Sequence, residues 1–188
     1  MPKRVKLADV ALIAFGIAYP SMVFFLRGTT DASVFIGLAL VCLGLRLVWG
    51  GVDAAYWRPA LLVCSAAVAC LALLDSALAV YAYPVVLSLA ASGVFAITLR
   101  QPPSLIEKLA LASGEIWSPE LRKYCRNVTA IWAVWLMINA AIAARLALLG
   151  DDRSWALWTG AINYLVSGAV FAIEWLVRRN LVQRQSRR

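Results

Sequence analysis

The sequence predicts an all-α polytopic membrane protein, a bundle of about six transmembrane helices with a short cytoplasmic amphipathic segment between helices 4 and 5. Three observations support this fold class. The 188 residues are 63% hydrophobic and only 15% charged, whereas soluble domains carry about 25% charged residues. The apolar residues form six runs near the roughly 20 residues that cross a bilayer as a helix. No run has the strict alternation of a membrane β-barrel strand.

The six runs are expected to form one transmembrane domain over residues 1–188. Each should be a helix, because lipid cannot pair free backbone groups and a helix pairs them internally. The third run is the shortest, and the connections are short except for residues 100–126. The predicted spans are 7–26, 32–50, 59–75, 77–99, 127–149 and 154–177.

The first span resembles a signal peptide, since a basic start precedes an apolar stretch. It lacks a small-residue cleavage site, and Tyr19, Pro20 and the bulky letters MVFFLRG stand in its place. We therefore expect this segment to be retained as the first helix.

The letters AYP occur twice, at 18–20 in the first span and at 82–84 in the fourth. Proline inside a helix removes one backbone hydrogen bond, and membrane helices tolerate this where neighbours or hydroxyl groups pair the freed carbonyl. The kinks are expected to let the tyrosine hydroxyls approach the bundle interior. Two inverted halves of three helices would also place one motif in span 1 and one in span 4. A chance match in an alanine-rich chain is the other explanation, and the sequence leaves both open.

The basic residues predict the orientation. Positive charge is retained in the cytoplasm, so both termini are expected inside, and the net charge of +8 is a topology signal and not a sign of nucleic-acid binding. Fourteen of the 18 lysines and arginines fall on one predicted side, within residues 3–6, 58, 100–126 and 178–188.

Tryptophans are enriched at both membrane interfaces, and several of the eight fit the predicted boundaries. Trp155 and Trp158 are expected in an aromatic belt at the outer boundary. Trp49, Trp57, Trp117 and Trp175 fall near the inner one.

The loop at 100–126 contains two helix-start signals. Ser104 followed by Glu107 is a capping-box pattern, and Ser118-Pro119-Glu120 combines an N-cap, a proline at the first helical position and an acid in the first turn. A short interfacial helix is expected here, followed by a helix that leads into span 5. This loop is a candidate docking site for a membrane or cytoplasmic protein partner, although the sequence favours a plain membrane-lying connector.

Polar residues inside spans are costly and tend to face the protein interior. In span 6, Asn163, Ser167, Glu174 and Arg178 recur on one helical face. By depth in the membrane, Arg46 of span 2 is expected to pair with Glu174.

Arg145 of span 5 is expected near the outer boundary. There it could meet Asp75, Asp151 or Asp31, or an anionic substrate.

Two interpretations of these groups remain open. In the structural one, Arg46 and Glu174 pair or extend to the interface, and the asparagines join helices by hydrogen bonds. In the functional one, spans 2, 5 and 6 enclose a polar pocket for an anionic or polar headgroup. Its candidate binding residues are Arg46, Asn139, Arg145, Asn163, Tyr164 and Glu174.

Catalysis has little support. The chain has no histidine, which removes the usual general base and the commonest metal ligand. No catalytic residue, metal ligand or cofactor is therefore predicted. Cys42, Cys64 and Cys70 should act as small apolar residues in spans, and Cys125 as an inert cytoplasmic thiol.

From residue 83 onward the chain resembles a family of small bacterial inner-membrane proteins encoded beside genes for aryl-polyene and fatty-acid-like biosynthesis. The elements that carry the resemblance are YPVVLSLAASGVF at 83–95, PPSLIEKLA at 102–110, YCRNVTAIW at 124–132 with IN at 138–139, WALWTGAINYLVSG at 155–168 and EWLVRR at 174–179. They cover about half of the chain.

The resemblance implies an accessory or transport role around a lipid-like acyl product at the bacterial inner membrane, with no established catalytic residues. Among the matched positions, those it marks for testing are Tyr83, Pro84, Glu107, Arg126, Asn139, Asn163, Tyr164 and Glu174.

The sequence therefore favours a non-enzymatic, multi-pass inner-membrane protein that assists the synthesis or export of an acyl compound. A small-solute or anion transporter is one alternative, and an embedded enzyme acting on a lipid headgroup is another. Membrane lipids and a lipid-like or anionic small molecule are the expected partners, and nucleic acid is not.

Overall fold

The computed structural model describes residues 7–49, 54–114 and 118–185, and this part of the chain is all helical. The predicted all-α class is confirmed. The helices are α1 (Leu7–Leu26), α2 (Ala32–Trp49), α3 (Ala54–Leu74), α4 (Ser76–Arg100), α5 (Leu105–Ala112), α6 (Pro119–Leu148), α7 (Asp152–Leu157), the π-helical turn η1 (Trp158–Ile162) and α8 (Asn163–Gln185).

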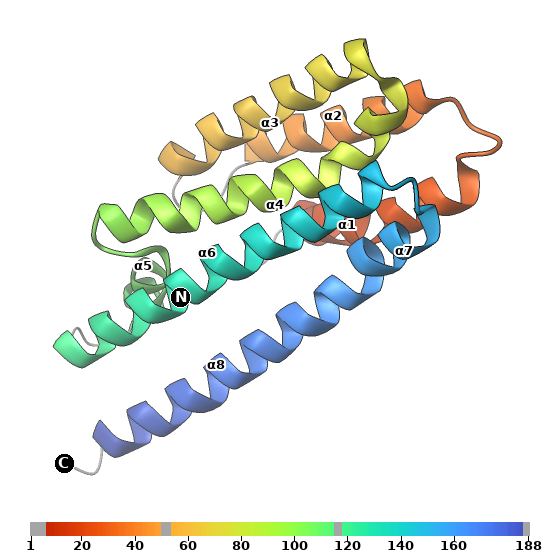
Figure 1. Ribbon diagram of the computed structural model, residues 1–188. Coiled ribbons are helices and arrows are strands. Elements are labelled where there is room, and N and C mark those ends of the chain that lie inside the picture. Colours follow the sequence, from red (N-terminus) through yellow and green to blue (C-terminus); the bar gives the residue numbers. More distant parts are fainter. Residues whose placement is uncertain (1–6, 50–53, 115–117, 186–188) are drawn as a thin grey trace.

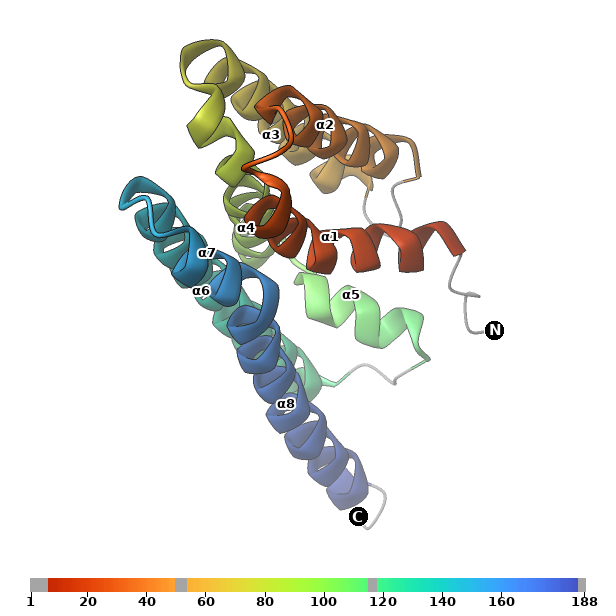
Figure 2. The same cartoon turned by 90° about the vertical axis from the view of Figure 1, so that its right-hand side faces the viewer.

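Helix α4 lies at the centre of the bundle. Helices α2, α3 and α6 pack against it, and in Figure 1 the axes of α2, α3, α4, α6 and α8 lie roughly parallel, with successive helices running in opposite chain directions. The main apolar core joins buried side chains of α1 to α4 with Trp155 of α7. Helix α1 packs on α7 and η1, and then α1 and α8 diverge away from η1 (Figure 2).

Within the described residues, four helical segments are long and apolar enough to cross a membrane: 55–74, 76–100, 119–148 and the continuous stretch 152–178. The apolar parts of α1 and α2 are shorter, at 14–26 and 32–48. Large apolar side chains such as Phe25, Leu73 and Leu165 are 77%, 88% and 74% exposed. Such extensive apolar exposure is rare on soluble monomers and fits a lipid-facing surface.

The observed helices extend beyond the predicted spans where local signals allow it. Helix α3 begins at Ala54 and includes Pro59, five residues before the predicted span. Helix α6 begins at Pro119 and not at 127, because the Ser118 hydroxyl caps the Leu121 N–H at 3.1 Å and the helix then continues without a break into the apolar run.

The short helix α5 packs on α6 and α4 and buries Leu105, Glu107 and Ala110. As the capping-box pattern predicts, the Glu107 carboxylate accepts a hydrogen bond from the Ser104 N–H at 3.2 Å. The same carboxylate lies 3.8 Å from Arg122 Nε at the start of α6. The short helix predicted to lie in the membrane interface therefore also packs against α6.

At the end of the bundle opposite α5 (Figure 1), polar and aromatic contacts join α1, α4 and α7. Arg27 forms an ion pair with Asp152 at 2.7 Å, Tyr81 donates a hydrogen bond to the same carboxylate, and the Arg27 guanidinium lies 4.8 Å from the Tyr81 ring centre. Trp155 packs edge-on against Tyr81 at 4.8 Å and is fully buried.

The predicted aromatic belt is therefore wrong for Trp155, which is 0% exposed. Trp158 also turns inward, since its indole N–H donates to Asn139 at 2.9 Å. Residues 152–157 form the short helix α7, and this helix brings both rings toward the bundle instead of the lipid.

Candidate functional site

The two AYP motifs meet inside the bundle. Tyr19 of α1 and Tyr83 of α4 are 0% and 1% exposed, and their ring centres lie 5.0 Å apart at an interplanar angle of 55°. Phe15 packs on both rings, with its centre 5.7 Å from Tyr19 and 6.2 Å from Tyr83. The motifs thus form one aromatic contact between α1 and α4.

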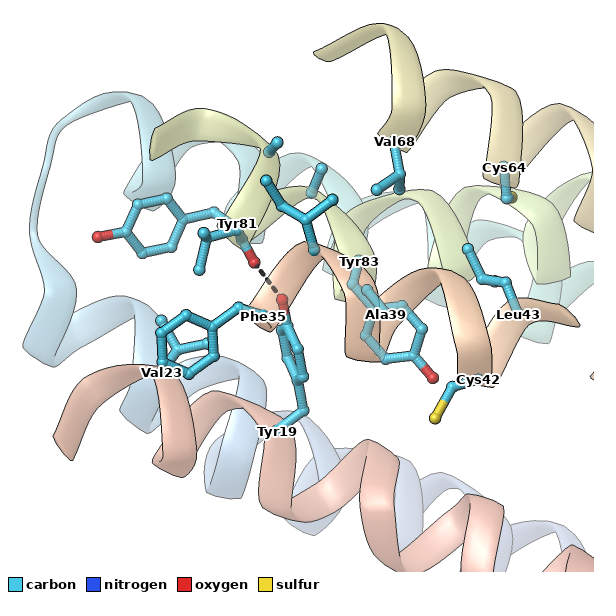
Figure 3. Close-up of a cluster of buried hydrophobic side chains, with 14 of the residues drawn as sticks. Tyr19, Val23, Phe35, Ala39, Cys42, Leu43, Cys64, Val68, Tyr81 and Tyr83 are labelled. Atoms are coloured by element: carbon cyan, nitrogen blue, oxygen red, sulfur yellow. Dashed lines mark hydrogen bonds between the residues drawn. The ribbon is translucent and has the colours of Figure 1, made fainter. Parts of the chain in front are cut away.

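Pro84 has no N–H, so the carbonyl of Val80, four residues earlier, loses its helical donor. The Tyr19 hydroxyl donates to this carbonyl at 2.7 Å (Figure 3). The expectation that a hydroxyl from a neighbour would pair the freed carbonyl is confirmed, and the donor is the tyrosine of the other motif.

A cavity of about 180 Å³ lies beside this contact. Six elements contribute to its wall: α1, α2, α4, α6, η1 and α8. The lining residues are Gly16, Arg46, Tyr83, Pro84, Leu87, Ser88, Asn139, Thr159, Asn163 and Tyr164.

Arg46 is the one ionisable group of that lining that is charged at neutral pH. Its Nη2 donates to the Leu12 carbonyl of α1 at 3.1 Å, so the side chain turns across the bundle instead of extending along α2 toward the interface. A Cβ atom on Gly16 would lie 3.8 Å from this Nη2 and 3.9 Å from the Tyr164 hydroxyl. A Cβ at position 16 would thus make ordinary contact with both polar groups, and a longer side chain would extend toward them.

Asn139 connects three elements at the far side of the cavity. Its amide nitrogen donates to the Ser88 hydroxyl of α4 at 2.9 Å, and its amide oxygen accepts from the Trp158 indole at 2.9 Å. Thr159 donates to the Trp155 carbonyl at 2.7 Å within the same turn. These groups have protein partners and hold the wall in place.

The turn η1 is a π-helix, a feature often found at functional sites. Gly160 faces α1 there, with Pro20 Cβ 3.6 Å and the Ser21 hydroxyl 3.7 Å from where its own Cβ would be. The close approach of η1 to α1 brings Thr159 and Asn163, one helical turn apart, onto the cavity.

Four of the six candidate binding residues predicted from the sequence line this cavity: Arg46, Asn139, Asn163 and Tyr164. Glu174 does not. It lies further along α8, where the Tyr124 hydroxyl donates to its carbonyl at 2.9 Å and to its carboxylate at 3.2 Å. The predicted pairing of Arg46 with Glu174 is wrong, because the two side chains bond to α1 and α6 respectively and form no ion pair with each other.

Arg145 also lies outside the cavity lining and is exposed on α6. Two of its three proposed partners cap helices instead: Asp75 accepts from the Ala77 and Leu78 N–H groups, and Asp151 accepts from the Ser154 N–H. No ion pair of Arg145 with Asp31, Asp75 or Asp151 occurs in the part of the chain that the structure describes.

Sequence reasoning did not place Gly16, Ser88 or Thr159 at the site. The available signal for Thr159 was its four-residue spacing from Asn163, which puts both on one helical face. Gly16 stands three residues before Tyr19, also on the same face of α1. Ser88 carried no comparable signal.

A second hollow of about 310 Å³ lies between α1 and the α7–η1 segment. Phe24, Phe25 and Leu157 make its wall largely apolar, and its polar members, Ser21 and Arg153, are exposed. It lacks the buried polar groups of the Arg46 cavity, which is therefore the candidate site.

The Arg46 cavity has the chemistry of a binding site. Its lining combines one cationic side chain with hydroxyl and amide groups, and no aspartate, glutamate or cysteine is among the lining residues. Among the described residues, no group of three or more potential metal ligands occurs. Comparison of the chain with protein-family models, curated proteins and solved structures found no match.

Proposed function

We propose that the chain is a multi-pass protein of the bacterial inner membrane that assists the synthesis or export of a lipid-like acyl compound without catalysing a reaction itself. The single observation that carries this proposal is the cavity beside the AYP contact. It places an arginine, two tyrosines and two asparagines within an otherwise apolar bundle. Polar and charged groups at such depth are costly and commonly mark a ligand site.

The proposed topology has six crossings with both termini in the cytoplasm. The Arg27–Asp152 ion pair brings the α1–α2 and α6–α7 connections together, and α5 lies at the opposite end of the bundle (Figure 1). Connections that alternate between ends support six crossings, including α1 and α2. The basic residues concentrated in residues 3–6, 100–126 and 178–188 favour the α5 end as the cytoplasmic one.

The sequence resemblance also implies a role in the synthesis or export of an acyl product. The residues that line the cavity are compatible with such a role. A lipid-like molecule needs a polar place for its headgroup and an apolar place for its chain. The cavity offers the first, and the exposed apolar side chains of the bundle offer the second.

Deletion of the gene tests this function in a strain that makes acyl or polyene products. We expect changed membrane-lipid or pigment profiles by mass spectrometry, restored by the wild-type gene. Complementation by the Arg145→Gln variant serves as a control, because Arg145 lies outside the cavity. Unchanged profiles in a producing strain would contradict the proposal.

A second candidate function, transport of a small anion, is favoured by the positive charge of Arg46 in a cavity of about 180 Å³. It predicts that proteoliposomes containing the protein release a trapped anion faster than empty liposomes. An embedded enzyme has less support, because Glu174 bonds to Tyr124 and no carboxylate lines the cavity.

A further inference from the structure

Two polar atoms on the cavity have no hydrogen-bond partner among the described residues. They are Arg46 Nε and the Tyr83 hydroxyl, both shielded from solvent. The Tyr83 side chain is 1% exposed, and in Figure 3 its hydroxyl points away from the hydrogen bond that Tyr19 makes. Buried polar groups almost always find a partner, so these two donors indicate a group that the described residues do not supply.

The positive charge of Arg46 indicates that the missing partner is negatively charged. A guanidinium stays protonated in proteins, and a buried charge needs a counter-charge or a dense set of hydrogen bonds. Arg46 makes one hydrogen bond, to the Leu12 carbonyl, and the lining contains no acid. The missing partner is therefore an anion, or the anionic end of a larger molecule.

The volume of the cavity and its two unpaired donors narrow the chemical class of the ligand. A cavity of about 150 Å³ holds one benzene-sized molecule, so 180 Å³ accommodates a small headgroup and the first carbons of a chain, and not a whole lipid. Arg46 Nε and the Tyr83 hydroxyl are two donors that match the two oxygens of a carboxylate. One positive charge also balances a carboxylate, whereas a phosphate monoester carries more charge.

Exposed apolar side chains of α1 and α8 border the cavity. Tyr164, on the cavity wall, is 39% exposed, and its neighbour Leu165 is 74% exposed. On the α1 side Ile17, next to Gly16, is 41% exposed. Because α1 and α8 diverge from this point (Figure 2), a chain that leaves the cavity meets apolar side chains and lipid.

We propose that this cavity binds the carboxylate of a linear acyl compound, with the carboxylate at Arg46 and Tyr83 and the chain directed outward between α1 and α8. This inference deepens the proposed function and rests on it for its biological setting. The binding itself can be tested independently of that setting.

The probe is tritiated dodecanoic acid, bound to the purified full-length protein in nonionic detergent and measured by scintillation proximity. Unlabelled dodecanoic acid, dodecanol and dodecyl phosphate serve as competitors with the same chain and different headgroups. We expect saturable binding that dodecanoate displaces and dodecanol does not. Equal displacement by dodecanol, or stronger displacement by dodecyl phosphate, would overturn the carboxylate assignment.

Tyr83→Phe is the sharpest variant, because the buried hydroxyl that it removes has no hydrogen-bond partner among the residues that the structure describes. Its removal should leave the melting temperature unchanged or higher and still weaken dodecanoate binding several-fold. Arg46→Gln should weaken binding about tenfold or more, as loss of a charged hydrogen-bond partner does. Tyr56→Phe and Arg145→Gln, both outside the cavity lining, are the matched controls and should bind as wild type.

Full dodecanoate affinity in a folded Tyr83→Phe protein would overturn the inference, as would the absence of saturable binding to the wild type. The failure of the inference is distinguishable from that of the proposed function. A deletion phenotype without dodecanoate binding removes the ligand assignment alone. Dodecanoate binding without a deletion phenotype removes the cellular role and leaves the site.

Discussion

The Tyr19 hydroxyl donates a hydrogen bond of 2.7 Å to the carbonyl of Val80. That carbonyl is unpaired in its own helix because Pro84 lacks an N–H. The donor, Tyr19, belongs to the first AYP motif, and the acceptor is free because of the proline of the second. The hydrogen bond that α4 loses at Pro84 is thus replaced by one between α1 and α4. Pro84 is thus tolerated within α4 because α1 supplies a replacement donor.

Loss of this donor should destabilise the fold only while Pro84 is present. Tyr19→Phe leaves the Val80 carbonyl buried and unpaired, and we expect a cost of about 1–2 kcal/mol in the free energy of unfolding. In a Pro84→Ala background the N–H of residue 84 can pair the carbonyl, so the same change should cost clearly less. Unfolding of the four proteins in detergent measures this coupling. Equal costs in both backgrounds would show that the bond does not compensate for the proline.

Asn139 should be important for stability because it connects α4, α6 and η1. Asn139→Ala leaves the Ser88 hydroxyl and the Trp158 indole without their partner, and we expect a loss of about 1–3 kcal/mol. Asn127→Ala, at an exposed position of the same helix, should change stability by less than about 0.5 kcal/mol. Thermal unfolding of both variants provides the comparison, and similar melting temperatures would count against the bridging role.

Asp75 should stabilise α4 through its N-cap. Its carboxylate accepts hydrogen bonds from the Ala77 and Leu78 N–H groups at 2.9 and 3.1 Å. Replacing a cap with alanine typically costs about 1 kcal/mol, whereas asparagine caps as well as aspartate does. Asp75→Ala should therefore lower the unfolding midpoint and Asp75→Asn should not. Equal loss in both variants would indicate a role for the charge instead of the cap.

Gly16 should control the volume of the cavity without supplying a polar group. A leucine at this position would extend toward Arg46 and Tyr164, and we expect Gly16→Leu to reduce dodecanoate binding about tenfold or more, as full occlusion would. Gly37→Leu is the control, because nothing lies within 4 Å of a Cβ at that helical glycine. Unimpaired binding in the Gly16→Leu protein would show that dodecanoate binds outside this cavity.

The topology predicts the behaviour of reporter fusions. Green fluorescent protein fused to either terminus should fluoresce, because both termini are proposed to be cytoplasmic. Alkaline phosphatase inserted in residues 27–31 or after Gly150 should be active, since these connections are proposed to face outward. Termini on opposite sides would contradict six crossings.

The sequence predicted well those features that depend on local patterns. The Ser118 cap, the Ser104–Glu107 pattern and the all-helical class follow from neighbouring residues and apolar length. It failed where the answer depends on which way a side chain faces around its helix. Arg46 and Glu174 were matched by depth alone, and depth does not say that Arg46 faces α1 while Glu174 faces α6.

The orientation of Trp155 could not be predicted from its position along the chain either. Its position near a span boundary fits an interfacial tryptophan, but α7 turns the ring onto Tyr81, where it is fully buried. Four candidate residues nevertheless share one cavity, because polar groups in apolar helices tend to face inward. Ser88 and Gly16 were not predicted, since small residues carry little signal in an alanine-rich chain.

The π-helical turn at Trp158–Ile162 closes with i→i+5 hydrogen bonds and so holds about one residue more than an α-helical turn does. Deleting one residue from this turn should therefore convert it to α-helix and leave Ser167 and Glu174 facing Trp135 and Tyr124, their partners on α6. Deleting Leu165 instead would rotate both side chains away by about 100°, because each residue of an α-helix contributes that angle. The turn is therefore the place in this segment where the loss of a residue leaves the contacts with α6 intact.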